Sequence, residues 1–341
     1  TSLPPALTAG ALASVRWLKQ HNEVREQHQE RAATLKAMMK AAGLPVMESS
    51  VSHIVPVMVG DAVHCKMISD ILLALAASGR PATEYAIVEL SAELRERQRG
   101  LLADFPQVQW LDAPPAAFSG LVLANEVLDA MPVQLLHFDG VRWLERGVVP
   151  AEGEGASTWA WADRPTELRP PVDDAALFVP GTVTEIHPQA EAFIATLAER
   201  LQRGAAFFID YGFPLAEYYH PQRVGGTLMC HRAHLADTDP LADVGAKDIT
   251  AHVNFTGIAL AAQDAGLEVL GYTSQARFLM NCGLLGLLEG ADLRTTAHAQ
   301  KLLTEHEMGE LFKVIGLARG CDAAFTTAPI GFAQGDRTHT L

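Results

Sequence analysis

The sequence contains little cysteine, and the spacing of its cysteines fits no common framework. Four of the 341 residues are cysteine, at Cys65, Cys230, Cys282 and Cys321. Because they are scattered and form no CxxC pair, neither a disulfide framework nor a structural zinc site is indicated, and a reducing compartment fits. Cys230 and His231, with His234 nearby, come nearest to a ligand cluster. We interpret them as a chance cluster in a polar loop and expect no metal.

An excess of positive charge and a long apolar run are also missing. The chain has 26 Lys and Arg against 40 Asp and Glu, a net charge of −14, which argues against nucleic acid as a partner. No apolar run approaches the roughly 20 residues of a membrane span. The opening TSLPPALTAG has neither a basic lead nor a long apolar core, so we expect no signal peptide. We expect a cytoplasmic protein, or one of the mitochondrial matrix if the source is a eukaryote.

A glycine-rich nucleotide loop is the third absence. The stretch 52–60, SHIVPVMVG, predicts a strand with a turn at Gly60, and a helix is expected over 63–77, after further helix within 1–40. This order opens many nucleotide-binding units, but a single glycine without GxGxxG is a weak sign of a phosphate cradle.

The pattern that is present predicts an α/β fold. Strands are expected at 84–90, 108–111 and 121–124, with a charged amphipathic helix over 91–102 between the first two. Alternation of strands and helices predicts a doubly wound, mostly parallel sheet. With 49% hydrophobic residues in 341, the chain can bury one large core or two medium ones.

Insertions and a helical end complete the expected order. A β-hairpin turning at Asp139-Gly140 and an exposed loop are expected within an insertion at about 134–180, and a substrate lid within 213–247. Between the insertions we expect a helix that Gly204 caps, followed by a buried strand over 205–209. The remaining expectations are a strand over 268–273, helices over 276–318 and an edge strand over 329–332.

Polar residues gather where two of the predicted strands end. The stretch LVLANEVLDAMPV turns from an apolar strand to Asn125, Glu126 and Asp129, and the strand at 205–209 leads into Asp210 and Tyr211. Ligands of open α/β sheets bind at the carboxyl ends of the strands, so these side chains should lie together. Asn and Asp that only shape turns are the alternative interpretation.

Several motifs together resemble the MidA-like family of class I S-adenosylmethionine-dependent methyltransferases, which includes a protein arginine methyltransferase of complex I assembly. The motifs are AIVELSAELRERQ, VLANEVLDAMPV, FFIDYGFP, EYYHPQR, GGTLMCH and DITAHVNF, in order over about 72–332. The resemblance implies the Rossmann-like fold and S-adenosyl-L-methionine as cofactor. It also implies that Glu89 holds the ribose, that Asp112 lies near the adenine, and that Asn125 and Glu126 line the place where donor and acceptor meet.

The same resemblance marks substrate contacts and one departure. Asp129, Asp210 and His252 are candidate substrate contacts, and Tyr211 is placed with them. Asn254 stands where the motif usually has Asp, so a carboxylate of the family is neutral here.

The front of the chain resembles a different family, 5-aminolevulinate synthase. TSLPPALTAGALASVRWLK and SHIVPVMVGDAVHCKMISD carry that resemblance over residues 1–71, so we predict a fusion with its junction near Ile71-Leu72. The segment corresponds to a part after the Schiff-base lysine, and no pyridoxal chemistry is expected. The methyltransferase's own glycine-rich loop is missing. Our hypothesis is that Ile54–Val59 fills the slot of the first strand and that Gly60 then borders the cofactor.

The resulting functional prediction is methylation of an arginine-bearing protein. A guanidinium stays charged in water, so carboxylates must orient it, and Glu126, Asp129 and His252 are the candidate catalytic residues. One alternative is a non-catalytic protein that keeps the methyltransferase fold and binds a partner, which the missing loop favours. Another is a non-functional fusion that carries the synthase fragment. The oligomeric state is left open.

Overall fold

A computed structural model describes residues 83–89, 92–151, 159–172, 178–232, 235–327 and 329–341. The chain divides into two compact units, Thr1–Pro114 and Pro115–Leu341, and each is described by itself. The predicted helices within 1–40 and over 63–77, the strand at 52–60, Gly60 and the fusion junction lie outside the described residues.

The described part of the first unit is a strand–helix–strand motif. Strand β1 (Tyr85–Val88) pairs in parallel with β2 (Val108–Leu111), and helix α4 (Ala92–Leu101) connects them. Leu102 and Val108 are buried between these elements. The predicted alternation is therefore present here, with strand ends within a few residues of the expected ones.

The second unit is built on a mixed sheet whose longest strand is β8 (Leu201–Phe213). Strands β3 (Phe118–Asn125) and β12 (Val253–Asn254) pair with β8 in parallel. On its other side β8 pairs antiparallel with β14 (Phe312–Arg319), which in turn pairs antiparallel with β13 (Glu268–Ser274).

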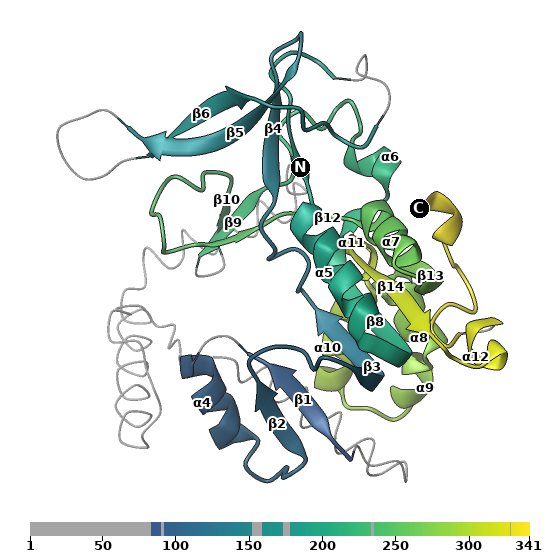
Figure 1. The fold of residues 1–341 in the computed structure, drawn as a ribbon. Coiled ribbons are helices and arrows are strands. Elements are labelled where there is room, and N and C mark those ends of the chain that lie inside the picture. Colours follow the sequence, from purple (N-terminus) through teal and green to yellow (C-terminus); the bar gives the residue numbers. More distant parts are fainter. Residues whose placement is uncertain (1–82, 90–91, 152–158, 173–177, 233–234, 328) are drawn as a thin grey trace, which may run out of the picture. The chain divides into compact units, whose positions relative to one another are not determined.

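Both faces of this sheet are covered, as in a doubly wound fold. Along β8, Ala206 and Phe208 point into one hydrophobic core and Ala205 and Phe207 into another, as the two-residue period of a strand requires. Helices α5 (Pro188–Arg200) and α7 (Phe255–Asp264) pack side by side over the first core (Figure 1). The helices after β13 are α8 (Gln275–Asn281), α9 (Leu284–Leu287), α10 (Leu293–Leu303), α11 (Met308–Leu311) and α12 (Ala323–Thr327), with a final 3-10 turn η2 (Thr338–Thr340).

The first predicted insertion is a four-stranded antiparallel sheet. Its order is β6-β5-β4-β7, formed by β4 (Gln134–Phe138), β5 (Trp143–Pro150), β6 (Trp159–Pro165) and β7 (Val183–Ile186). The hairpin turn falls at Asp139-Gly140 as expected, with Gly140 at φ 98°. Tyr218 of the short helix α6 (Leu215–Tyr218) and its C-cap Tyr219 join the core of this sheet.

The segment expected as a lid has regular structure of its own. After α6 it forms β9 (Met229–Arg232) and β10 (Leu235–Asp237), and β11 (Asp248–Thr250) completes a three-stranded antiparallel sheet with β9 in the middle. Backbone pairing in this sheet satisfies groups that an unstructured loop would leave to water.

Three sequence expectations were wrong. Helix α5 ends at Arg200 with Leu201 as its C-cap, whereas Gly204 lies inside β8 at φ 142°, where a side chain would collide with the backbone of Gly120. Residues 312–319, expected as helix, form the buried strand β14. Residues 329–332, expected as an edge strand, form a turn.

Candidate functional site

The carboxyl ends of β3 and β8 meet, as the sequence predicted. Just beyond β3 the amide of Glu126 donates to the carbonyl of Ile209 in β8 (2.9 Å). Glu126 adopts φ 50°, unusual for a residue with a side chain, and Asn125 Nδ2 donates to its Oε1 (3.1 Å). Glu126 is exposed and Asn125 is half-buried. Strained backbone at a strand end is frequent at functional sites.

Asp210 fixes the loop that follows β3. Its Oδ2 accepts hydrogen bonds from the backbone amides of Val127 (3.2 Å), Leu128 (2.9 Å) and Asp129 (3.2 Å), and its Oδ1 accepts from the amide of Tyr211 (2.9 Å). Asp210 is buried and lines neither of the cavities described below. Its place in the structure is that of a loop anchor, and direct substrate contact by Asp210 stays a prediction.

Asp129 is the carboxylate that this loop presents. Its Oδ2 accepts a short hydrogen bond from the Tyr211 hydroxyl, and its backbone carbonyl accepts from the amide of Ala251 (3.0 Å). The residue is 4% exposed, yet its Oδ1 accepts no hydrogen bond from the residues that the structure describes. An unpaired oxygen on a buried carboxylate is costly in a folded protein, which makes this atom a candidate ligand contact.

Burial controls the protonation of this pair of carboxyl groups. Burial, and then the charge of Asp129, raises the pKa of Asp210 to about 7, against the pull of its backbone amide donors. Burial also raises the pKa of Asp129, although the Tyr211 hydrogen bond opposes the rise. The Tyr211 phenol has a raised pKa, chiefly from burial, and therefore acts as a hydrogen-bond donor.

His252 lies next to Tyr211. Its ring packs edge-on against the Tyr211 ring (centroids 5.2 Å apart) and stacks on Phe213 (5.3 Å). Burial, and then the charge of Arg223, lowers the pKa of His252 to about 4, so the ring is neutral near pH 7. Its buried Nδ1 has no hydrogen-bond partner among the described residues. A catalytic role for His252 is not tested by this geometry and stays a prediction.

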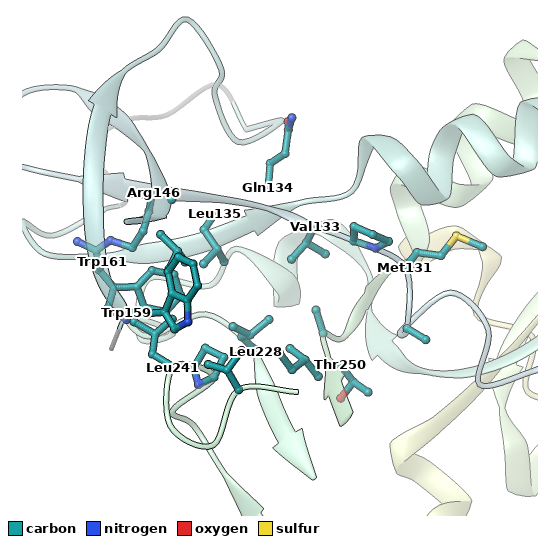
Figure 2. A pocket seen from close by; sticks show the side chains of 18 of the residues that line it. Met131, Val133, Gln134, Leu135, Arg146, Trp159, Trp161, Leu228, Leu241 and Thr250 are labelled. Carbon is teal, nitrogen blue, oxygen red and sulfur yellow. The ribbon is translucent and has the colours of Figure 1, made fainter. Parts of the chain in front are cut away.

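Asp129 lines a cavity of about 660 Å³ between the loop after β3 and the inserted sheets. Figure 2 shows Trp159 and Trp161 of β6 beside each other in the wall, with Thr250 at the opposite end. Glu145 and Arg146 also line it, but Glu145 is paired with Arg164 (2.8 Å) and Arg146 with Asp163 (2.8 Å). Two buried side-chain atoms of this lining have no hydrogen-bond partner among the described residues, Oδ1 of Asp129 and the hydroxyl of Thr250. The lining thus combines apolar side chains with one buried carboxylate.

A second cavity, of about 480 Å³, shares a wall with the first. The residues common to both are Leu135, Arg146, Trp161, Leu228 and Pro240. The second cavity is also lined by Glu185, Arg223 and His252.

The predicted nucleoside contacts lie in the first unit. Glu89 follows β1 and its Oε2 accepts from Gln98 Nε2 (3.0 Å), while Asp112 follows β2 and pairs with Arg95 (2.8 Å). Arg95 also donates to the carbonyls of Glu89 (2.7 Å) and Leu111 (3.0 Å), which ties the two strand ends together. The structure thus places Glu89 with Asp112, and Asn125 and Glu126 with Asp129 and Tyr211.

Asn254, which departs from the family motif, caps helix α7. Its side-chain oxygen accepts from the amide of Gly257 (3.3 Å), a bond that Asn and Asp make equally well at an N-cap.

Sequence reasoning missed the walls of both cavities. Trp159 and Trp161 alternate along β6, a period-two signal that lay inside a segment interpreted as an exposed insertion. Arg223 was visible only as the end of EYYHPQR. Glu185 carries no local signal of its role.

Within the described ranges no three His, Cys, Asp or Glu side chains are arranged to hold a metal ion. No helix among these residues combines the length and the hydrophobicity required to cross a membrane.

Comparison with known proteins confirms both resemblances. 5-Aminolevulinate synthase 1 of Cereibacter sphaeroides is 62% identical over 73 residues, which are 21% of this chain and 18% of that enzyme. The mitochondrial protein arginine methyltransferase NDUFAF7 homologue of Drosophila melanogaster is 29% identical over 254 residues. The alignment covers 68% of this chain, and the chain spans about half (55%) of that relative's length.

Two solved structures from Burkholderia thailandensis are similar over most of the chain. One, with S-adenosyl-homocysteine bound, is 49% identical with a TM-score of 0.73, covering 81% of this chain and 73% of its own. The other is 40% identical with a TM-score of 0.74, covering 94% and 98%. These matches confirm the predicted class I methyltransferase fold.

A family model described as "Putative S-adenosyl-L-methionine-dependent methyltransferase" matches residues 64–273, more than half of the chain. The chain therefore belongs to this methyltransferase family, whose cofactor is the predicted S-adenosyl-L-methionine.

Proposed function

We propose that the chain transfers a methyl group from S-adenosyl-L-methionine to an arginine side chain of a protein. The observation that carries this proposal is the buried, unpartnered Oδ1 of Asp129 on the wall of the 660 Å³ cavity. The Drosophila relative, named a protein arginine methyltransferase, supports the same acceptor.

The residues of the first unit fit the nucleoside end of the cofactor. Ribose hydroxyls and the adenine amino group are donors, and the carboxylates of Glu89 and Asp112 at adjacent parallel strand ends are acceptors. A cofactor contact by Asn125, at the end of β3, stays a prediction. Gly60, predicted at the methionine end, lies outside the described residues.

The acceptor arginine would enter the cavity with its guanidinium toward Asp129. A carboxylate binds a guanidinium through charge-assisted hydrogen bonds, and Oδ1 has that capacity free. Tyr211 holds the other oxygen, so the carboxylate presents one defined face. Exposed Glu126 stands at the same strand end and can steer the cation inward.

Asp129 can also take the proton that methylation releases. When bound, the cofactor supplies an electrophilic methyl group and leaves as a neutral thioether. The guanidinium nitrogen that forms the new bond to carbon must lose a proton. Because burial raises the pKa of Asp129, this carboxylate is a better proton acceptor than an exposed one.

The division of the chain belongs to the same proposal. A synthase-like segment at 1–71 would precede a methyltransferase-like domain at 72–341, with insertions at about 134–180 and 213–247. The cytoplasm or the mitochondrial matrix stays the predicted location, and the named relative in Drosophila is mitochondrial.

The test is calorimetric titration of S-adenosylmethionine into the purified chain, beside Glu89→Ala and the matched control Glu96→Ala. Glu96 is exposed on α4 and pairs with Arg99 (3.5 Å). Binding that Glu89→Ala loses and Glu96→Ala keeps is the expected result. Mass spectrometry of arginine peptides incubated with chain and cofactor then tests transfer.

The same experiment separates the two alternatives. Binding without transfer to any arginine peptide would indicate a non-catalytic protein of methyltransferase fold. A folded chain that binds no cofactor would indicate a fusion that keeps the fold and has lost the function.

A further inference from the structure

Arg223 lines the second cavity, and its guanidinium has no ion-pair partner among the residues that the structure describes. Among the described residues, no Asp or Glu oxygen forms an ion pair with its guanidinium, and its buried Nε has no hydrogen-bond partner. A half-buried guanidinium normally finds an anion, so its partner is to be sought outside the described residues.

The guanidinium is restrained by packing on an aromatic ring. Its Cζ lies 4.3 Å from the centroid of the Phe213 ring, and the Phe213 ring also stacks on His252, with ring planes 3° apart. Stacking on an aromatic face stabilises the cation in part and leaves the edge of its fork available for planar anions. Such a restrained fork binds a carboxylate with less loss of side-chain entropy.

The other ionisable groups of this cavity do not neutralise Arg223. Arg146 is paired with Asp163 (2.8 Å). Glu185 is fully buried, and its oxygens accept from the amides of Thr227 (2.8 Å) and Leu228 (3.1 Å) and from the Tyr218 hydroxyl (3.0 Å). His252 adds no charge near pH 7, because its pKa is about 4. Among the described residues of the lining, Arg223 is therefore the cation that is left to pair with an anion.

We propose that this second cavity binds a carboxylate side chain of the substrate protein, on the same polypeptide as the acceptor arginine. The inference rests on the proposed function, since it assumes that Asp129 marks the acceptor site. It is supported by the shared wall, formed by residues such as Trp161 and Leu228, along which one extended peptide can reach both cavities. The substrate sequence would then carry an acidic residue at a fixed offset from its arginine.

The experiment uses the full chain and a short synthetic peptide pool. Arginine is fixed at the centre, and every other position is an equal mixture of Ala, Ser, Leu, Asp and Asn. Two fractions are sequenced by mass spectrometry: peptides methylated in the presence of cofactor, and peptides retained by the immobilised chain without cofactor. We expect Asp to be enriched over Asn by about tenfold at one position in both fractions.

The variant Arg223→Gln should abolish that enrichment, while the matched control Arg232→Gln keeps it. Arg232 is exposed, pairs with Asp243 (3.1 Å) and lines neither cavity. The ratio of Asp to Asn is internal to each pool, so a change in overall rate does not affect it. If Arg223→Gln does not fold by thermal melting, Arg223→Lys, which keeps the charge without the planar fork, should reduce the enrichment.

Three results would overturn the inference: no position that favours Asp, an enrichment that survives Arg223→Gln, or a loss of cofactor affinity in Arg223→Gln. The last would assign the carboxylate to the methionine end of the cofactor instead. If the proposed function itself is wrong, the result differs from these three, because the chain would methylate no peptide at all. The retained fraction would still report whether Arg223 selects an acid.

Discussion

Asp129 and Glu185 are two buried carboxylates of the second unit that differ in how their oxygens are satisfied. Glu185 accepts from two backbone amides, from the Tyr218 hydroxyl and, more weakly, from the Thr227 hydroxyl (3.3 Å). Asp129 accepts from Tyr211 at one oxygen and, among the described residues, from none at the other. Both have raised pKa values because of burial.

The difference separates a structural carboxylate from a functional one. Glu185 binds the segment at 227–228 to the inserted sheet, and the hydroxyl of Thr227 in turn accepts from the amide of His252 (3.0 Å). Both carboxylate oxygens of Glu185 therefore accept hydrogen bonds that hold the fold together. Asp129, which lines a cavity, has one oxygen without such a bond among the described residues, and stabilising the fold does not require that oxygen to be unpaired.

The largest expected effect is on the methylation rate, from a substitution of Asp129. Asp129→Asn should lower the methylation rate roughly 10²- to 10⁴-fold, because the amide neither attracts a guanidinium nor accepts its proton. Cofactor affinity, measured by calorimetry, should stay within about twofold. Initial rates on an arginine peptide give the measurement.

Asp264→Asn is the matched control, since Asp264 is an exposed carboxylate at the end of α7. A rate for Asp129→Asn close to that of this control would remove Asp129 from the mechanism.

The next largest effect is on the free energy of unfolding, from a substitution of Glu185. Glu185→Ala leaves the amides of Thr227 and Leu228 and the Tyr218 hydroxyl without their acceptor, at ~1–3 kcal/mol for each buried group. We expect the free energy of unfolding in urea to fall by about 3 kcal/mol or more. Glu185→Gln keeps one acceptor oxygen and should lose less. Equal stability of the alanine variant and the wild type would contradict the assigned role.

A smaller loss of stability is expected from a substitution of Gly226, whose backbone lies next to the Glu185 carboxylate. Gly226 has φ 72°, and a Cβ there would lie 2.3 Å from Oε1 of Glu185. Gly226→Ala should therefore cost roughly 2 kcal/mol through backbone strain and displacement of the carboxylate. Gly225→Ala, whose Cβ would meet nothing within 4 Å, is the neighbouring control. Denaturation that ranks the two variants in the opposite order would exclude a tight fit around Glu185.

The fold was predictable where one periodicity dominates. The short apolar runs before Glu89, Asp112 and Asn125 predicted strands, and their polar ends predicted where side chains gather. Strand β14 was missed because its sequence FKVIGLAR, apolar apart from Lys313 and Arg319, fits a helix as well when its neighbourhood is helical. Its antiparallel pairing with β8 and β13 is a long-range property.

The sequence predicted which residues gather at the site, but it did not predict the contacts that each of them makes. Asp129, Asp210 and Tyr211 could be named, whereas the use of Asp210 as loop anchor depends on amides of residues 127–129 brought together by the sheet. The pairing of Arg146 with Asp163 and the isolation of Arg223 depend equally on tertiary packing. Charge compensation across a fold leaves no local trace in a sequence.

The smallest expected effect is a change in how stability depends on pH. The pKa of Asp210 is raised from 3.8 to about 7 in the folded chain, so between these values the folded state binds a proton that the unfolded state does not. This stabilising contribution is complete below pH 3.8 and is lost as pH rises to about 7. Asp129→Asn removes the second cause of the shift, the neighbouring charge, together with the raised pKa of Asp129 itself. The variant should therefore lose less unfolding free energy than the wild type between about pH 5 and about pH 8 in urea titrations. Parallel pH profiles for the two chains would mean that the charges of Asp129 and Asp210 are not coupled, and the buried pair would then be two independent carboxyl groups.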